Sequence, residues 1–330
     1  MKNKTVHSIG EFGLIEMIKH KFGAINSSKN IIAGIGDDCF CFKTDRNTII
    51  CITKDMLIEN VHFKKNWISA KELGQKAIEV NVSDIAAMGN VKPKYIFIGL
   101  GIPPATSEKF IRDLTSGFET ACKKYKMTVG GGDTVKDDKI TISITAIGIT
   151  KEKIIKRSGA GPGDLIGVTN TFGSAGAAIA LLYKYGIRHK YSKEELSFIH
   201  KQNNPSARIK EAEKIAKYLT SMTDASDGLY TSVELLANAS NLGADVYIDQ
   251  IPLPDSFAKI FKDTEKQLDF ALFGGEDYEL VFTVPKSKST AIQKLTPNIT
   301  YIGRMNSSKE VKYFYNGKKQ KVKYKGFRHF

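Results

Sequence analysis

The chain carries six short acidic motifs, and each sets an aspartate or a glutamate among glycines, hydroxyls or amides. Carboxylates crowded into one site repel each other and stay ionised only beside a compensating cation. Hard oxygen ligands with nearby hydroxyls suit Mg²⁺, which usually completes its shell with water and phosphate oxygens. The sequence therefore predicts a fold that brings these segments into one polynuclear Mg²⁺–phosphate site. The motifs are Gly36-Asp37-Asp38, Thr53-Lys54-Asp55, Asn81-Val82-Ser83-Asp84, Gly130-Gly131-Gly132-Asp133-Thr134, Asp224-Ala225-Ser226-Asp227-Gly228 and Gly274-Gly275-Glu276-Asp277.

Length and composition are those of an ordinary soluble enzyme. The chain has 330 residues, 42% of them hydrophobic, which is enough for two domains with full cores. No secretory-type apolar stretch follows Met1, and no apolar run reaches the roughly 18 residues of a membrane span. The formal charge of +14 comes mostly from scattered lysines without a nucleic-acid-binding motif. We expect a solvated lysine surface, with neither nucleic acid nor membrane as a partner.

The four cysteines indicate a reducing compartment. They form no CxxC pair, and no pair of histidines stands at zinc spacing. Cys39 and Cys41, two residues apart, would share one face of a strand. Small buried thiols are the favoured interpretation, and we therefore expect a cytoplasmic protein.

In the first half of the chain, hydrophobic periodicity predicts alternating strands and helices. The last predicted strand alternates strongly, but its apolar positions change face after Gly148, which we interpret as a bulge. The order strand, helix, strand, helix, strand favours a split βαβ arrangement within an α+β fold. After a helix over Glu11–Lys21, the elements are a strand over Thr48–Thr53, a helix over Ala70–Met88, a strand over Lys94–Ile102, a helix over Ser107–Tyr125 and a strand over Lys139–Thr150.

A turn-rich stretch over Lys151–Gly163 predicts a boundary between an N-terminal domain, residues 1–150, and a C-terminal α/β domain, residues 151–330. The second domain restarts with a strand over Leu165–Asn170. The glycine-rich segment Thr171–Gly176 either places a helix N-terminus on phosphate or serves close helix packing. Further helices are expected over Ser206–Leu219, Leu229–Ala239 and Lys286–Leu295, and further strands near Ala244–Ile248 and Tyr278–Val284.

Several acidic positions stand where secondary structure would present them to a shared site. Asp55 follows an apolar strand, and Asp84 shares one face of a predicted helix with Asn81. Both residue types are mildly unfavourable inside a helix, which argues for a site there. Three glycines before Asp133 free the backbone to approach a phosphate, although a hairpin turn explains them as well. For the Asp224–Gly228 motif, helix capping is the alternative.

Two basic residues are candidates for the same site. His62 lies seven residues after Asp55, close enough to touch the same ligand, although a lone histidine is usually structural. Arg157 stands in the turn-rich stretch and suits a nucleotide phosphate, with a surface arginine as the alternative.

In their order, the motifs resemble those of the thiamine-monophosphate kinase family, ATP-dependent enzymes that make thiamine diphosphate. The resemblance runs from Gly10-Glu11-Phe12 to Gly326-Phe327, nearly the whole chain. Its most specific parts are Asn-Val-Ser-Asp-Ile-Ala-Ala-Met-Gly at residues 81–89 and Gly-Gly-Glu-Asp-Tyr-Glu-Leu at residues 274–280. The second part separates this family from aminoimidazole ribonucleotide synthetase, selenophosphate synthetase and a hydrogenase maturation protein.

The resemblance implies a two-domain α+β fold in which the N-terminal sheets of two subunits pair into a barrel-like homodimer. It also implies that ATP lies at the domain junction and that Mg²⁺ and thiamine monophosphate bind beside it. Carried over by motif, the implied Mg²⁺ ligands are Asp38, Thr53, Asp55, Asp84, Asp133, Asp224 and Asp227, of which the implied catalytic residues are Asp84, Asp55 and Asp133. The implied ATP contacts are Gly132, Asp133, Arg157 and Ser226, and the implied acceptor contacts are His62, Glu276 and Phe327.

The expected mechanism is direct in-line transfer of the ATP γ-phosphoryl group to the phosphate of thiamine monophosphate. That phosphate is largely ionised at neutral pH, with a second pKa of about 6, so it needs no strong general base. It needs Mg²⁺ ions that suppress repulsion between two polyanions. Lys54 and Arg328 depart from the family pattern, which commonly has a hydroxyl residue and an aspartate there. The alternatives are another ATP-using enzyme of the same superfamily and a catalytically inactive nucleotide- and metal-binding protein.

Overall fold

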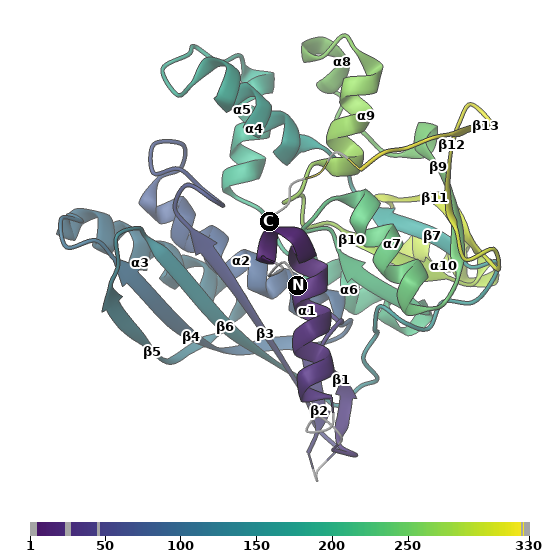
Figure 1. The fold of residues 1–330 in the computed structure, drawn as a ribbon, viewed down its shortest axis with the longest axis horizontal. Coiled ribbons are helices and arrows are strands. Elements are labelled where there is room, and N and C mark those ends of the chain that lie inside the picture. The colour runs from purple at the N-terminus through teal and green to yellow at the C-terminus, as the bar shows by residue number, and fades with distance from the viewer. Residues whose placement is uncertain (1–4, 24–27, 45–46, 325, 327–330) are drawn as a thin grey trace.

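The computed structural model describes residues 5–23, 28–44, 47–324 and 326, and it shows a two-domain α+β fold with one sheet in each half of the chain (Figure 1). The N-terminal sheet has six strands in the order β1-β2-β3-β6-β4-β5, and the C-terminal sheet has seven in the order β13-β12-β9-β11-β7-β10-β8. In the described part of the chain, no helix is long and apolar enough to cross a membrane.

The N-terminal sheet contains the predicted split βαβ arrangement. β3 (Ile49–Ile58) and β4 (Lys92–Ile102) are both antiparallel to β6 (Thr141–Thr150), which lies between them. Helix α2 (Ala70–Ala87) connects β3 to β4 across β6, so this prediction is confirmed. The other elements of this half are α1 (Val6–Phe22), β1 (Ile31–Ala33), β2 (Phe40–Lys43), α3 (Glu108–Tyr125) and β5 (Thr128–Lys136).

Helix α2 is held firmly between the sheet and its neighbour α3. Its first turn is a capping box, in which the side chains of Ser69 and Glu72 each accept the other's backbone N–H. Gly74 of α2 lies against Gly117 of α3, where an added Cβ at either position would stand 2.1–2.2 Å from a backbone oxygen. Only glycine permits this approach. The position of α2 matters because the helix carries several polar residues of the site described below.

Strand β6 is regular, so the bulge predicted at Gly148 is wrong. Its residues alternate between the two faces to the end, and the register irregularity lies on β4, between Pro93 and Tyr95. Gly148 faces α2, where an added Cβ would stand 2.9 Å from the side chain of Ile85. Ile147 and Ile149 lie on the opposite face. The change of apolar face therefore reflects a second apolar surface on the outside of the sheet.

The C-terminal sheet is mostly antiparallel, so the predicted α/β character of this domain is wrong and the α+β class holds for both halves. β12 and β9 pair in parallel, and the other neighbouring strands pair antiparallel. The strands are β7 (Leu165–Thr169), β8 (Ser221–Asp224), β9 (Gly243–Tyr247), β10 (Leu280–Val284), β11 (Ile299–Asn306), β12 (Val311–Tyr315) and β13 (Lys318–Gln320).

Helices α4, α5 and α9 stand together beside the junction of the two domains (Figure 1). The sequence analysis missed α5 and α9 and expected one longer helix where α6 and η1 follow each other. The α-helices of this half are α4 (Ser174–Tyr185), α5 (Lys193–Asn203), α6 (Ile209–Ile215), α7 (Leu229–Ala239), α8 (Phe257–Ile260), α9 (Thr264–Phe273) and α10 (Ser289–Leu295). Short 3₁₀ turns are η1 (Ala216–Tyr218), η2 (Ile248–Gln250) and η3 (Lys286–Lys288).

Candidate active site

Three aspartates from distant parts of the chain meet where the two domains join. Asp38 precedes β2, Asp84 lies near the end of α2, and Asp224 is the last residue of β8. One carboxylate oxygen from each lies within 4.8 Å of the other two. The structure therefore brings together three of the six acidic motifs at one point.

Short polar contacts from α2 fix the geometry around this aspartate cluster. The Thr53 hydroxyl on β3 donates a hydrogen bond to the Asp84 carboxylate. The side-chain carbonyl of Asn81 accepts the backbone N–H of Asp55 at 3.0 Å, and the Ser83 hydroxyl donates to Asp224 at 2.5 Å. The polar face of α2 thus orients groups from both domains. This arrangement explains why residues that are unfavourable inside a helix stand here.

Arg157 joins the turn-rich linker to the same cluster. Its Nη2 donates to Asp38 at 2.7 Å, and its Nε donates to the Thr223 hydroxyl at 3.2 Å. The Thr223 hydroxyl in turn donates to Asp38 at 2.8 Å, while the Arg157 backbone N–H donates to Asp37 at 3.2 Å. The predicted surface alternative for Arg157 is therefore wrong, because its side chain is only 18% exposed and faces the aspartates.

The aspartate cluster has more negative charge than its protein partners compensate. Burial raises the pKa of Asp84 well above its ordinary value, and the charges of Asp55, Asp224 and Asp38 raise it further. Burial and the Asp38 charge raise the pKa of Asp224 to about 8, and burial and the Asp227 charge raise that of Asp55 to about 6. Such shifts mean that ionised carboxylates here require a cation.

The hydrogen bonding of two carboxylate oxygens indicates whether a metal ion would fit the aspartate cluster. Oδ2 of Asp38 and Oδ1 of Asp224 are buried and have no hydrogen-bond partner among the described residues. A buried acceptor without a partner is costly, and an oxygen-preferring dication would satisfy both. The donor set of carboxylates and a hydroxyl therefore fits Mg²⁺.

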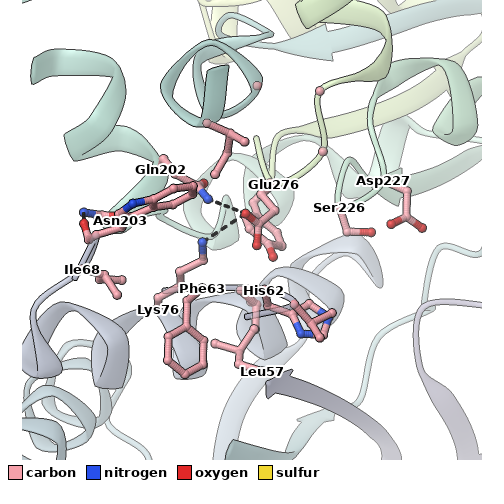
Figure 2. A pocket seen from close by; sticks show the side chains of 18 of the residues that line it. Leu57, His62, Phe63, Ile68, Lys76, Gln202, Asn203, Ser226, Asp227 and Glu276 are labelled. Atoms are coloured by element: carbon pink, nitrogen blue, oxygen red, sulfur yellow. Dashed lines mark hydrogen bonds and ion pairs between the residues drawn. The ribbon is translucent and has the colours of Figure 1, made fainter. Parts of the chain in front are cut away.

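A cavity of about 640 Å³ opens beside Asp55 and is lined by residues of both domains. In the view of Figure 2, Ser226 and Asp227 lie toward one end, and Lys76, Gln202 and Asn203 lie toward the other. The same cavity is lined by Leu57, His62, Phe63, Trp67, Ile68, Tyr183, Glu276 and Tyr278. The structure thus places His62, Ser226, Asp227 and Glu276, four of the residues implied by resemblance, around one cavity with Asp55.

Glu276 stands at the centre of a partly buried polar network that the sequence analysis only partly anticipated. Its carboxylate accepts from Lys76 at 3.2 Å and from Gln202 at 2.5 Å (Figure 2). Its backbone is left-handed, with φ 65°, a strained conformation that often marks functional sites. Lys76 was missed, although a lysine in the apolar stripe with Leu73 and Val80 was a signal that could have found it.

His62 lies at the turn after β3 with its ring orientation fixed. Its Nδ1 accepts the backbone N–H of Ile58 at 3.0 Å. In the neutral ring the proton is therefore on Nε2, the nitrogen that can donate a hydrogen bond.

Asp277 and Gly274 of the Gly274–Leu280 motif hold the start of α4. The Asp277 carboxylate accepts the backbone N–H groups of Gly173 and Ala175 at 2.6 and 3.3 Å, at the start of α4. An added Cβ at Gly176 would stand 3.0 Å from the Cα of Gly274. Close packing is thus confirmed for this glycine-rich segment. A phosphate at this helix start is wrong, because a carboxylate of the protein already occupies it.

Gly132 and Asp133 are not brought to the aspartate cluster within one chain. They lie on the edge strand β5, and Gly132 shares one ladder row with Ile98, Ile144 and Asp55. Three strand spacings therefore separate Gly132 from Asp55, or roughly 14 Å. Neither the predicted hairpin turn nor a phosphate loop is seen here.

The remaining positions from the sequence analysis are Lys54, the Asp224–Gly228 motif and Phe327. Lys54 lies on the outer face of β3 and donates to the Thr145 hydroxyl at 3.4 Å, away from the aspartates. Helix α7 begins after Gly228 without a side-chain cap, so the capping alternative for the Asp224–Gly228 motif is wrong. Phe327 lies outside the described residues.

Sequence comparison places this site in a known superfamily. The sequence model described as "AIR synthase related protein, N-terminal domain" matches residues 36–150, and the corresponding C-terminal domain model matches residues 161–316. A curated thiamine-monophosphate kinase from Aquifex aeolicus is 36% identical over 327 residues, covering 98% of this chain and 98% of the relative. The chain belongs to the thiamine-monophosphate kinase family.

Other relatives agree with this assignment. The thiamine-monophosphate kinase of Bacillus subtilis is 32% identical over 313 residues, covering 91% of this chain and 94% of the relative. Among solved structures, AaThiL complexed with AMPPCP and TMP aligns with a TM-score of 0.86 and 34% identity over 100% of both chains. The members of this family are enzymes that this chain matches along nearly its full length.

Proposed function

We propose that the protein transfers the γ-phosphoryl group of ATP to thiamine monophosphate and releases thiamine diphosphate. One observation carries the proposal: a buried aspartate cluster lies at the domain junction beside a cavity of about 640 Å³ whose wall holds Glu276 of the family-specific motif. The AaThiL complex with AMPPCP and TMP supports it, because an ATP analogue and TMP are bound there together. We assign metal binding and dimerisation to the N-terminal domain, residues 1–150. The C-terminal domain, residues 151–330, would complete the ATP and substrate site.

The residues that would hold several Mg²⁺ ions are those around the aspartate cluster. Asp38, Asp84 and Asp224 supply carboxylates, and Thr53, Asp55 and Asp227 extend the set, with Asp84 and Asp55 as catalytic candidates. Bound Mg²⁺ would supply charge neutralisation between the two phosphates. The protein's own contribution is positioning: Thr53 orients Asp84, Asn81 holds the backbone of Asp55, and Arg157 balances Asp38. Arg157 and Ser226 are the ATP contacts that we propose on this side of the cavity.

A phosphate group as the acceptor explains why the proposed site needs metal ions and no strong general base. A phosphate monoester is already largely ionised at neutral pH, so the protein has to align two anions rather than remove a proton. We therefore propose direct in-line transfer without a phosphoenzyme. His62 and Glu276 line the cavity where the acceptor would bind, and we propose both as acceptor contacts. For Phe327 the same role stays a prediction from the family resemblance.

We also propose a homodimer formed through the outer face of the N-terminal sheet. Met56, Tyr95 and Phe97 lie on that face with exposed fractions of 42–45%, which is unusual for large apolar side chains in a row of strands. Asp133 lies in the same ladder row as Met56, on the same face. The metal and ATP roles implied for Asp133 and Gly132 would then depend on the partner subunit, since they lie far from the aspartate cluster within one chain.

A complementation experiment tests the dimer and the role of Asp133 together. Asp84→Asn and Asp133→Asn chains are each expected to be inactive as homodimers. If Asp133 acts across the dimer, equal coexpression of the two chains restores about a quarter of wild-type activity, since half of the dimers are mixed and half of the sites in these are intact. No recovery in mixed dimers, isolated through a different affinity tag on each chain, would overturn the proposal.

The decisive experiment for the reaction is a product assay with ATP, Mg²⁺ and thiamine monophosphate. Thiamine diphosphate should form, and free thiamine should not be converted at a comparable rate, because its nucleophile is a hydroxyl. Conversion of an aminoimidazole precursor instead would favour another enzyme of the superfamily. Binding of ATP and metal without any product would favour an inactive nucleotide- and metal-binding protein.

A further inference from the structure

Two aromatic side chains from different domains meet on the wall of the cavity. Trp67 belongs to the segment between β3 and α2, and Tyr183 lies on α4. Their ring centroids are 4.8 Å apart and the rings are nearly perpendicular, with an interplanar angle of 89°. This aromatic pair, Trp67 and Tyr183, lines the same cavity as Glu276.

The aromatic pair already holds a cation from the protein itself. The ammonium nitrogen of Lys64 lies 4.5 Å from the centroid of the Trp67 ring and 4.4 Å from that of Tyr183. Both distances are within the roughly 6 Å at which a cation is attracted by the negative face of an aromatic ring. The corner formed by the two perpendicular rings is therefore a place where a positive charge is stable.

The surrounding structure keeps Trp67 in position while Lys64 is free to leave. The Trp67 backbone N–H donates to the Lys64 carbonyl at 2.8 Å, and the Asn203 side chain donates to the Trp67 carbonyl at 2.8 Å. The Lys64 side chain reaches the rings on a flexible aliphatic stem, so its ammonium can move into solvent when a ligand cation takes its place. A ligand cation can thus replace it without rearranging the rings.

We propose that Trp67 and Tyr183 form the subsite for the positively charged ring of the acceptor, and that the Lys64 ammonium occupies this subsite until the substrate enters. This inference rests on the proposed function, since the thiazolium of thiamine monophosphate is a flat cation. The aromatic pair lies at the end of the cavity away from the aspartate cluster, which leaves the length of α2 between a ring cation and a phosphate. Lys76 and Asp84 are eight residues apart on α2, or about 12 Å along the helix axis, and Asn203 places Trp67 beside Gln202 at the Lys76 end.

The competing explanation is that the Lys64–Trp67–Tyr183 contact only joins the two domains. The two explanations differ in what they predict for ligand affinity. If the contact is only structural, removing an aromatic ring lowers the melting temperature and leaves acceptor binding unchanged. If the aromatic pair is a subsite, the affinity for a cationic ring falls and the affinity for a neutral ring of the same shape does not.

The experiment uses Trp67, the single tryptophan of the chain, as its own reporter. Thiamine monophosphate is titrated into the full-length protein without ATP, and a change in tryptophan fluorescence gives the dissociation constant. Tyr183→Leu keeps an apolar side chain at this largely exposed position and should weaken binding roughly 3- to 30-fold. The matched control is Tyr185→Leu on the same helix, where the ring stacks on His189 outside the cavity; it should bind as wild type does.

A neutral analogue and a lysine variant sharpen the test. For 3-deazathiamine monophosphate, in which an uncharged thiophene replaces the thiazolium, Tyr183→Leu should change the dissociation constant by less than about 2-fold. Lys64→Ala should tighten binding of thiamine monophosphate, because the substrate no longer competes with an internal cation. Weaker binding in Lys64→Ala, or equal losses for the charged and the neutral ligand in Tyr183→Leu, would overturn the proposal.

The outcomes separate this inference from the proposed function. If the wild-type protein makes thiamine diphosphate and Tyr183→Leu binds the acceptor with unchanged affinity, the aromatic subsite is ruled out. The kinase activity is then still supported. A wild-type protein that neither binds nor converts thiamine monophosphate overturns both.

Discussion

Lys76 of α2 and Glu276 of the loop after α9 form an ion pair of 3.2 Å between the two domains, and the Lys76 side chain is only 1% exposed. Gln202 of α5 is the second partner of the same carboxylate. The Lys76 charge, although buried this completely, is tolerated because its partner carboxylate is held in place. Burying either charge without the other would lower the free energy of unfolding. The Lys76 end of the cavity is thus fixed by electrostatics that link both halves of the chain.

We therefore expect Glu276→Ala to lower the free energy of unfolding by about 1–3 kcal/mol, below the full cost of breaking a buried pair because Glu276 itself is 23% exposed. Urea denaturation measures this. The double variant Lys76→Met, Glu276→Ala should recover most of the stability, because no buried charge is left unpaired. It should not recover activity. A double variant that is less stable than Glu276→Ala would show that Lys76 has another partner that matters more.

Asp84→Asn keeps the shape of the side chain and removes one charge from the aspartate cluster. We expect a loss of at least ~100-fold in turnover with an unchanged circular dichroism spectrum, since preorganised charge stabilisation of the transition state is lost. The matched control is Asp113→Asn on α3, an exposed aspartate paired with Lys109, which should retain wild-type turnover. Near-normal activity of Asp84→Asn at saturating Mg²⁺ would remove Asp84 from the catalytic residues.

The raised pKa values of the cluster predict how Mg²⁺ and pH act together on stability. Asp55 and Asp224 have folded pKa values of about 6 and about 8, above those of an unfolded chain. The folded state without metal therefore binds more protons than the unfolded state, and its stability falls as pH rises from about 4 through 8. Bound Mg²⁺ should remove this penalty, because it favours the ionised carboxylates.

The increase in melting temperature on adding Mg²⁺ should consequently be small at pH 5 and large at pH 8, at matched ionic strength. Thermal melts with and without a chelator measure it. Asp84→Asn serves as the control, because the loss of one ligand should flatten the pH dependence of the Mg²⁺ effect. A Mg²⁺ effect that is equal at both pH values, or larger at pH 5, would contradict a carboxylate site.

The sequence predicted which polar residues share a helix face better than it predicted which strands lie side by side. The spacing of Asn81 and Asp84 predicted one helix face, and the structure shows that face contacting β3. Short polar motifs carry this information because their ligand atoms are local. Which strand lies next to which is a long-range property, and so Asp133 was placed with Asp84 although β6 and β4 separate β5 from β3.

The Lys76 end of the cavity was hardest to predict because its residues come from elements without a strong periodic signal. Gln202 and Asn203 end α5, a short helix that the sequence analysis missed, and the Gly274–Leu280 motif follows the equally missed α9. Buried polar residues such as Lys76 reveal their role only when the partner from the other domain is known. Hydrophobic patterning has no means of pairing residues 200 positions apart.

The packing at Gly148 gives a last prediction, which connects the sheet to the aspartate cluster. An added Cβ at Gly148 would stand 2.6 Å from Val91 and 2.9 Å from Ile85, the residue after Asp84. Gly148→Ala should push this end of α2 away from the sheet and lower the free energy of unfolding by about 1–3 kcal/mol, the usual cost of overpacking. Because Thr53 and Asp84 form their hydrogen bond across the same gap, turnover should fall as well.

Gly161→Ala is the matched control, since its Cβ would meet no atom closer than 3.7 Å. Urea denaturation and turnover are measured on both variants. Equal free energies of unfolding would mean that α2 moves away from the added methyl group at no measurable cost. The Thr53–Asp84 contact would then not depend on a glycine at position 148.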